Sequence, residues 1–277
     1  MSKVLYEQGV AIAEVTLNRP DKLNAIDEEM LAGLETALDT AAGDDAIRVL
    51  LLCGRGRAFS AGFDLASWAP WEGDSREESV RRELRRDFDF IMRVWDFPKP
   101  IVAAVHGFCL GSSLEVTAVS DITVAAEGCR FGVPEVRFGS GAVCLILPWI
   151  IGLKNARELL LTGSDRIDAR RAEAMGLVNH VVAAENLMEH ARGVAEEIAA
   201  NDLVAVRLTK QAINRSVEVA GLRQALEEAL AIDLEIELTD TPESREFNRI
   251  LEVQGPKAAL KWRASQSHQA AGTGSAV

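Results

Sequence analysis

Short apolar segments at regular intervals constrain the fold of this chain more than any other feature. Residues 49–53 are apolar at every position, and residues 101–105 and 122–126 are similar strand-like segments. A strand without polar positions has both faces buried, as in a parallel sheet covered by helices. A helix is predicted from residue 28, because Asp27 is a favourable N-cap and apolar residues follow it at helical spacing. Strands that alternate with helices predict an α/β fold.

The second half of the chain changes to a mainly helical pattern. After residue 155 only residues 177–182 have the character of a strand. Helices are then predicted at residues 186–200, 203–219, 222–239, 243–253 and 256–264. We therefore expect an α/β core over residues 1–200, a helical region over residues 201–265 and a disordered tail over residues 266–277.

The net charge limits the kinds of molecule that this protein is expected to bind, and the cysteine content indicates the redox state of its compartment. The 277 residues carry a net charge of −12 and have a pI of about 4.9. This acidic field repels nucleic acid and anionic membranes, so neither is an expected partner. The four cysteines form no C-x-x-C pair, which is typical of reduced, buried thiols in the cytosol. The first ten residues lack the apolar segment of a signal peptide, and a cytoplasmic location is expected.

Two glutamates twenty positions apart are the strongest chemical signal. Glu115 ends the motif H-G-F-C-L-G-S-S-L-E, and Glu135 ends the motif F-G-V-P-E. Upstream, residues 58–65 form the small-residue stretch A-F-S-A-G-F-D-L. Two carboxyl groups beside a pocket walled by backbone N–H groups would suit proton transfer next to a carbonyl.

Each motif alone also has an ordinary structural explanation. The A-G-x-D sequence fits a tight turn, and Gly111-Ser112-Ser113 fits a helix start at which the Ser112 N–H is an unpaired donor. Such a donor can polarise a carbonyl oxygen. The sequence contains no phosphate-binding G-x-x-x-x-G-K-[ST] motif, and its four histidines lack metal-ligand spacing, so no metal is predicted. His106 precedes the Gly111 turn and is a weaker candidate for the site.

The order of the motifs is far more specific than any one of them. The segment from Arg57 to Gly139 contains A-G-x-D-L, H-G-x-x-L-G-x-x-x-E, D-I-x-x-A and F-G-x-P-E in succession. This order resembles the crotonase superfamily, the enoyl-CoA hydratase/isomerase family. Similar features extend over nearly the whole chain, from L-N-R-P at residues 17–20 to L-L-T-G at residues 160–163.

The resemblance implies a spiral of repeated ββα units with a C-terminal helical trimerisation region. It implies a lyase acting on an acyl-CoA thioester in fatty acid metabolism, with no cofactor besides the coenzyme A of the substrate, and a homotrimer or homohexamer. By position, the oxyanion-hole amides fall on Phe63 and Ser112, and the catalytic glutamates fall on Glu115 and Glu135. The coenzyme A contacts fall on Lys22, Asn24, Ala25, Ala61, Gly62, Asp64, Leu65 and Gly111.

An enoyl-CoA hydratase is the leading interpretation, with Glu115 as base and Glu135 as acid. The helix start favours an ionised Glu115, and apolar neighbours favour a protonated Glu135. The sequence departs from the family at Ser112-Ser113, where glycines are usual, and at residues 140–146, where bulkier apolar groups replace a glycine-rich segment. The alternatives are a Δ3-Δ2-enoyl-CoA isomerase, another acyl-CoA lyase of the family, and a non-catalytic acyl-CoA-binding or assembly protein.

The C-terminal helices suggest two further contacts. A monomer is expected to leave apolar side chains of the helix at residues 222–239 partly exposed: Leu226, Leu230, Leu234 and Ile236. Lys257 and Lys261 lie on the last predicted helix and could meet a coenzyme A phosphate, if need be on a neighbouring subunit.

Overall fold

Two β-sheets form the centre of the structure, a computed structural model that describes residues 2–66 and 73–272. The larger sheet has the order β1-β2-β3-β4-β6-β9, and only its β1–β2 pair is antiparallel. Its strands are β1 (Val4–Gln8), β2 (Ile12–Leu17), β3 (Val49–Gly54), β4 (Ile101–Val105), β6 (Ile122–Ala126) and β9 (His180–Val182). The smaller sheet contains β5 (Phe108–Leu110), β7 (Arg130–Gly132) and β8 (Ile167–Asp168).

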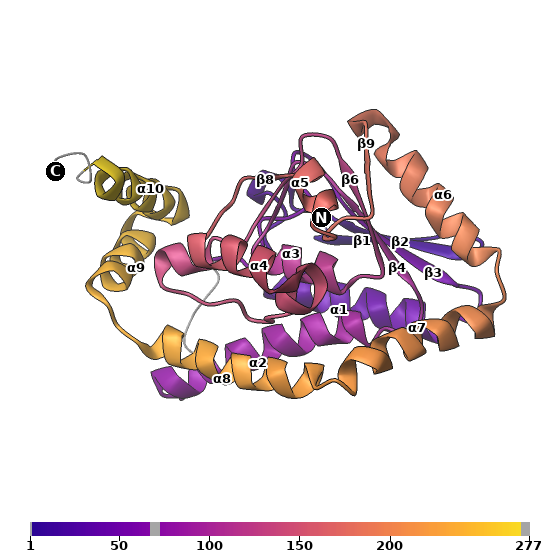
Figure 1. The fold of residues 1–277 in the computed structure, drawn as a ribbon, viewed down its shortest axis with the longest axis horizontal. Coiled ribbons are helices and arrows are strands. Elements are labelled where there is room, and N and C mark those ends of the chain that lie inside the picture. The colour runs from indigo at the N-terminus through magenta and orange to yellow at the C-terminus, as the bar shows by residue number, and fades with distance from the viewer. Residues whose placement is uncertain (1, 67–72, 273–277) are drawn as a thin grey trace.

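Helices surround the larger sheet and then continue as a C-terminal series (Figure 1). The first six are α1 (Glu28–Gly43), α2 (Arg76–Trp95), α3 (Ser112–Val119), α4 (Leu147–Thr162), α5 (Ala169–Ala174) and α6 (Leu187–Ala199). The series continues with α7 (Leu203–Glu218), α8 (Leu222–Leu238), α9 (Pro242–Gln254) and α10 (Pro256–Gly272). Short 3₁₀ turns are η1 (Pro20–Lys22), η2 (Glu135–Phe138) and η3 (Ala184–Asn186).

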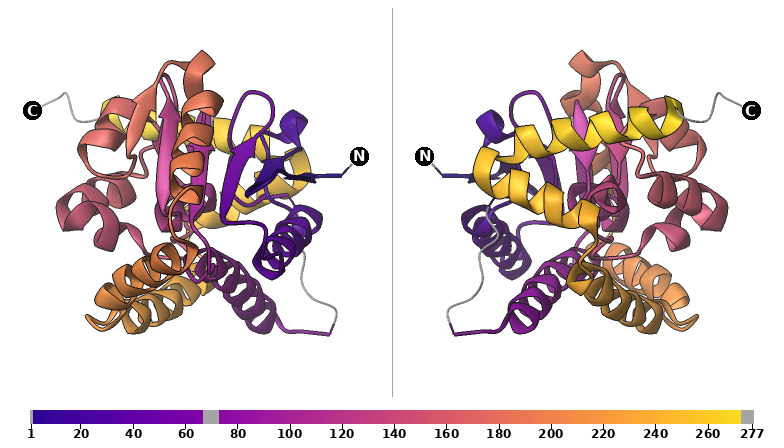
Figure 2. Two further views of the ribbon diagram at one scale, coloured as in Figure 1. Left: turned by 90° about the vertical axis from the view of Figure 1, so that its right-hand side faces the viewer. Right: turned by 90° about the vertical axis from the view of Figure 1, so that its left-hand side faces the viewer.

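The apolar strands are buried on both faces, as the sequence predicts. In β3, Leu50 and Leu52 belong to the main core with residues of α1 and α2, while Val49 and Leu51 pack in a second core beneath α6. Adjacent strand residues point to opposite faces of a sheet, so two cores require apolar residues at every position. Figure 2 shows α6 lying along one side of the sheet and α1 on the other.

Capping residues define where the helices begin. The Asp27 side chain accepts a hydrogen bond from Met30 N and caps α1 as predicted. Ser75 and Glu78 form a capping box at the start of α2. Helices α2 and α8 lie side by side (Figure 1). Arginines of α2 form ion pairs with acidic side chains, and one of these pairs, Arg85–Glu227, joins α2 to α8.

The structure corrects several predicted boundaries. Residues 108–110, for which no strand was predicted, form strand β5. Helix α4 begins at Leu147, before the change to a helical pattern predicted after residue 155. Gly152, at φ +75°, interrupts α4 and conceals its helical pattern in the sequence. Helix α10 continues to Gly272, past the predicted end at residue 264, and the last five residues of the predicted tail, 273–277, lie outside the described residues.

The C-terminal arm, defined here as α9 and α10, folds back over the same chain. Phe247 of α9 stacks on Phe138 of η2 with ring centroids 5.1 Å apart. Phe247, Ile250 and Ala259 form a third apolar cluster, against which Leu65 also packs. The right-hand view of Figure 2 shows both helices crossing one face of the molecule. Every helix within residues 2–66 and 73–272 is too short or too polar to span a bilayer.

Candidate active site

Helix α3 holds the first glutamate in the interior. All eight of its residues are buried, so Glu115 is surrounded by protein although it lies in the first helical turn. Gly111 precedes the helix at φ +58°, a left-handed conformation that suits glycine. The Glu115 Oε1 accepts a hydrogen bond of 3.1 Å from Cys144 N. The segment after Glu135 therefore supplies a direct partner to the other glutamate.

The second glutamate lies against the start of the same helix. Glu135 is the first residue of η2, and a β-carbon on residue 111 would overlap its Oε1. Only glycine at position 111 allows the carboxyl group to approach the backbone this closely. The other oxygen, Oε2, is buried and has no hydrogen-bond partner among the described residues. The two glutamates predicted from the sequence are thus brought to one helix terminus.

Burial controls the protonation of both glutamates. It raises the pKa of Glu115 well above its usual range, and the negative charge of Glu135 raises it further. Burial also raises the pKa of Glu135 to about 8. The helix start was expected to favour an ionised Glu115, but the loss of solvation on burial outweighs that effect. Interacting carboxyl groups of this kind titrate as a pair.

A third carboxyl group at the site was not predicted from the sequence. Asp233 of α8 is 2% exposed, and its side-chain oxygens have no hydrogen-bond partner of good geometry among the described residues, although the backbone of Gly141 is close enough to lower its pKa. Burial raises the pKa of Asp233 to about 7, and its charge raises the pKa values of both Glu115 and Glu135. A β-carbon on Gly141 would collide with Asp233 Oδ1. No local motif surrounds Asp233, so only the packing of α8 reveals it.

The two predicted oxyanion-hole residues meet directly. The Phe63 N–H donates a hydrogen bond of 2.9 Å to Ser112 Oγ. The Ser112 N–H, at the first position of α3, has no acceptor among the residues that the structure describes. The family resemblance implies two backbone donors, the N–H groups of Phe63 and Ser112. In the structure the Ser112 hydroxyl group accepts a hydrogen bond from the first of them.

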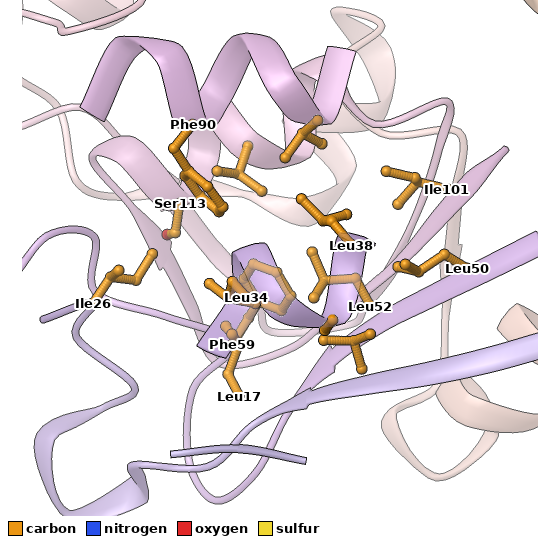
Figure 3. A pocket seen from close by; sticks show the side chains of 14 residues that line it. Leu17, Ile26, Leu34, Leu38, Leu50, Leu52, Phe59, Phe90, Ile101 and Ser113 are labelled. Carbon is orange, nitrogen blue, oxygen red and sulfur yellow. The ribbon is translucent and has the colours of Figure 1, made fainter. Parts of the chain in front are cut away.

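The neighbouring serine faces the interior instead. Ser113 Oγ donates to the carbonyl oxygens of Ser60 and Leu110, at 2.9 and 2.7 Å. It borders a cavity of about 20 Å³ whose other drawn lining side chains are apolar, among them Phe59 and Phe90 (Figure 3). This volume holds about one water molecule, so the cavity is a packing defect of the core and is too small for a substrate.

The loops expected to bind coenzyme A are joined to each other by hydrogen bonds. Asn24 is fully buried, and its Nδ2 donates to the carbonyl oxygens of Arg55, Ala58 and Phe59. Ala61 N donates to Leu23 O, and Ile26 N donates to Gly62 O. The side chain of Asn24 is therefore committed to loop structure, which sequence reasoning did not predict.

Other predicted contacts lie at the edges of this region. Asp64 forms an ion pair with Arg19, with 2.6 Å between Oδ2 and Nη1, and Ala25 O accepts from the same Arg19 nitrogen. The side chains of Lys22, Lys257 and Lys261 are exposed. His106 Nε2 lies 3.0 Å from Gly56 O and thus contacts the loop after β3. All four cysteines are buried free thiols.

The fold and site together define a class: α/β proteins of the crotonase type, in which buried carboxyl groups meet a helix start. A sequence model described as enoyl-CoA hydratase/isomerase matches residues 7–248. The chain therefore belongs to the enoyl-CoA hydratase/isomerase family, and the predicted spiral α/β fold with a helical C-terminal region is confirmed.

Individual relatives agree with this assignment. The chain is 33% identical over 232 residues to the 2,3-dehydroadipyl-CoA hydratase of Escherichia coli, which covers 81% of this chain and 88% of the relative. It is 32% identical over 244 residues to the short-chain-enoyl-CoA hydratase of Clostridium acetobutylicum, and the match covers 85% of this chain and 88% of the relative. A crystal structure of an enoyl-CoA hydratase/isomerase from Xanthobacter autotrophicus Py2 superposes with a TM-score of 0.90 at 43% identity, covering 96% and 98%.

Proposed function

We propose that this protein is an enoyl-CoA hydratase that adds water across the α,β double bond of an acyl-CoA thioester. The observation that carries the proposal is the convergence of Glu115 and Glu135 on the start of α3, beside an N–H without an acceptor among the described residues. Hydration needs a base for the attacking water, an acid for the α-carbon and a donor for the thioester oxygen. The names of the relatives support the same chemistry.

The positions of the carboxyl groups support distinct roles. Glu135 lies against Gly111, next to the Ser112 N–H. A thioester oxygen that accepted from this N–H would bring the substrate's α-carbon, one bond from the thioester carbon, towards Glu135. Glu135 is therefore the proposed acid for the α-carbon, and a pKa of about 8 keeps it protonated at neutral pH. Glu115 is the proposed base. Burial opposes its ionisation, and the hydrogen bond from Cys144 N favours the charged form.

We expect the substrate to contact the loops around Asn24 and Ala61, which are joined to each other by hydrogen bonds. The thioester and pantetheine portion would run past Ala61, Gly62 and Leu65, with Lys22, Lys257 and Lys261 available to the coenzyme A phosphates. Because α9 and α10 pack on Leu65 of the same chain, these lysines would serve the site of their own subunit. The proposed reaction requires no cofactor besides the coenzyme A of the substrate. The relatives named above act on different acyl groups, so the acyl preference of this chain is a separate question.

Turnover of crotonyl-CoA tests the proposal. Loss of the enoyl-thioester absorbance at micromolar enzyme should follow saturation kinetics, and mass spectrometry should find a product heavier by one water. A β,γ-enoyl-CoA substrate converted to a product of unchanged mass, without hydration, would identify an isomerase, which needs only one carboxyl group. Tight binding of acyl-CoA without turnover of any enoyl-CoA in a chain-length series would identify a binding protein.

A further inference from the structure

Ser112 offers two hydrogen-bond donors at the start of α3. Its N–H has no acceptor among residues 2–66 and 73–272, and its hydroxyl group accepts from Phe63 N without donating to any described residue. Ser112 is only 4% exposed. Buried donors are nearly always paired, so two unpaired donors on one residue indicate a missing acceptor. A ligand oxygen that accepted from both donors would satisfy this residue.

The same hydrogen bond removes the Phe63 N–H from direct contact with that oxygen. An N–H that already donates to Ser112 Oγ at 2.9 Å has little remaining capacity for a second acceptor. It instead polarises the hydroxyl group, because hydrogen bonds in a chain strengthen one another in a low-dielectric site. The Phe63 amide thus acts on a ligand through the serine.

Resting on the proposed function, we propose that Ser112 supplies both direct donors of the oxyanion hole, its N–H and its hydroxyl group, with the Phe63 N–H behind the hydroxyl. The thioester oxygen would accept from both donors as it gains enolate charge. Phe63 then becomes a positioning residue. Glycine is usual at this position in the family. The serine of this chain would then be a functional change, because glycine has no hydroxyl group to donate.

Carbonyl polarisation tests this arrangement separately from hydration. Cinnamoyl-CoA has a conjugated thioester whose absorbance shifts to longer wavelength as its oxygen is polarised. We would bind it to Glu115→Gln protein, which is slowed in turnover, and compare Ser112→Ala, Ser112→Cys and Ser112→Thr in that background. The Ala and Cys variants should lose most of the shift, because a thiol is a weak donor. The Thr variant should retain it.

Ser113→Ala is the matched control, since its hydroxyl group faces the core and donates to Ser60 O and Leu110 O. It should retain the shift even if its thermal stability falls. In the chain with Glu115 intact, Ser112→Ala should reduce kcat for crotonyl-CoA by about 10²–10³-fold, as expected for one oxyanion donor.

The outcomes separate the two proposals. An unchanged shift and rate in Ser112→Ala would overturn the donor role. A larger shift with faster turnover would also overturn it, and would mean that the hydroxyl group blocks the Phe63 N–H from the ligand. A shift that depends on Ser112 in a protein that does not hydrate crotonyl-CoA would sustain the donor role while refuting the hydratase. No shift in the protein with Ser112 intact would overturn both.

Discussion

At the scale of residues, the site combines groups that the sequence reveals with groups that only packing reveals. Glu115 and Glu135 were predicted from motifs whose order and spacing resemble the family's, and the structure brings both to the start of α3. The Asp233 carboxyl group reaches the site from α8, about a hundred positions later, and no motif marks it. The bond between Phe63 N and Ser112 Oγ depends on a side-chain rotamer, which a sequence pattern does not specify.

The glutamate pair leads to the first prediction. Glu115→Gln and Glu135→Gln should each lower kcat for crotonyl-CoA by at least about 10²-fold, because an amide can neither accept nor deliver the proton. Steady-state kinetics with circular dichroism as the folding check would measure this. Glu189→Gln, which changes an exposed glutamate of α6, should match the unsubstituted protein. Near-normal rates in both site variants would refute the two-carboxyl mechanism.

Asp233 leads to a prediction about stability and pH. Its pKa is about 7 in the folded protein and near 4 when unfolded. Between these values the folded state retains a proton that the unfolded state has lost, so stability falls as pH rises through this window. Asp233→Asn carries no charge and avoids the loss. The gain in Tm over the unsubstituted protein should be about 5 °C larger at pH 8 than at pH 5.

Thermal unfolding followed by circular dichroism at both pH values would measure the difference between the two proteins. The comparison cancels titrations remote from Asp233. Removing its charge also lowers the pKa values of Glu115 and Glu135, which adds to the stabilisation at pH 8. The prediction is wrong if the Tm difference between the two proteins is the same at pH 5 and pH 8. Ionisation of Asp233 would then not destabilise the folded state.

At the scale of elements, long periodic segments were predictable and short ones were not. The apolar strands β3, β4 and β6 and the capped helix α1 have enough residues to show a pattern. Strands β5 and β7 have three residues each, too few for periodicity, and owe their strand conformation to pairing with each other. This pairing matters because β5 leads directly into Gly111 and α3.

We expect the segment at residues 140–146 to influence acyl specificity. Cys144 is buried and its N–H holds Glu115, while Val143 and Leu145 are partly buried beside the core. Shortening the two apolar side chains should enlarge the space near the glutamates without removing the Cys144 N–H. We expect Val143→Gly or Leu145→Ala to shift kcat/KM towards longer or bulkier acyl groups by about 10-fold or more.

The measurement is the ratio of kcat/KM for crotonyl-CoA to that for a long-chain enoyl-CoA. Val10→Ala provides the control, because Val10 is 96% exposed in the turn between β1 and β2. An unchanged ratio in folded, active Val143 and Leu145 variants would assign the segment to packing alone.

At the scale of the whole molecule, one expectation about assembly needs correction. Four apolar residues of α8 were expected to be partly exposed in a monomer. Leu226 and Leu230 are instead 1% and 6% exposed, whereas Leu234 is partly buried and Ile236 is 39% exposed, as expected. Leu226 and Leu230 belong to the main core, and α8 packs on α2 within the same chain. Apolar side chains are exposed elsewhere, on α4, α7 and α8: Leu153, Leu161, Val204, Leu208 and Ile232.

These exposed apolar residues favour association, as the family resemblance implies. Light scattering at micromolar concentration should give the mass of three or six chains. Replacing Val204 and Leu208 of α7 with lysine should shift the mass towards a single chain if this face is covered, whereas Leu226 variants should unfold instead. A monomer mass for the unsubstituted protein at high concentration would refute the homotrimer and the homohexamer.

The stacking of Phe247 on Phe138 has a consequence for assemblies that contain unlike chains. The arm packs on η2, the turn that contains Glu135, within one chain, so we expect subunits not to exchange arms. Chains damaged by Phe247→Ala, refolded together with chains damaged by Glu135→Gln, should regain no activity. Recovery of turnover on mixing would mean that the arm crosses between subunits. In genetic language, two defective alleles of this gene should fail to complement each other.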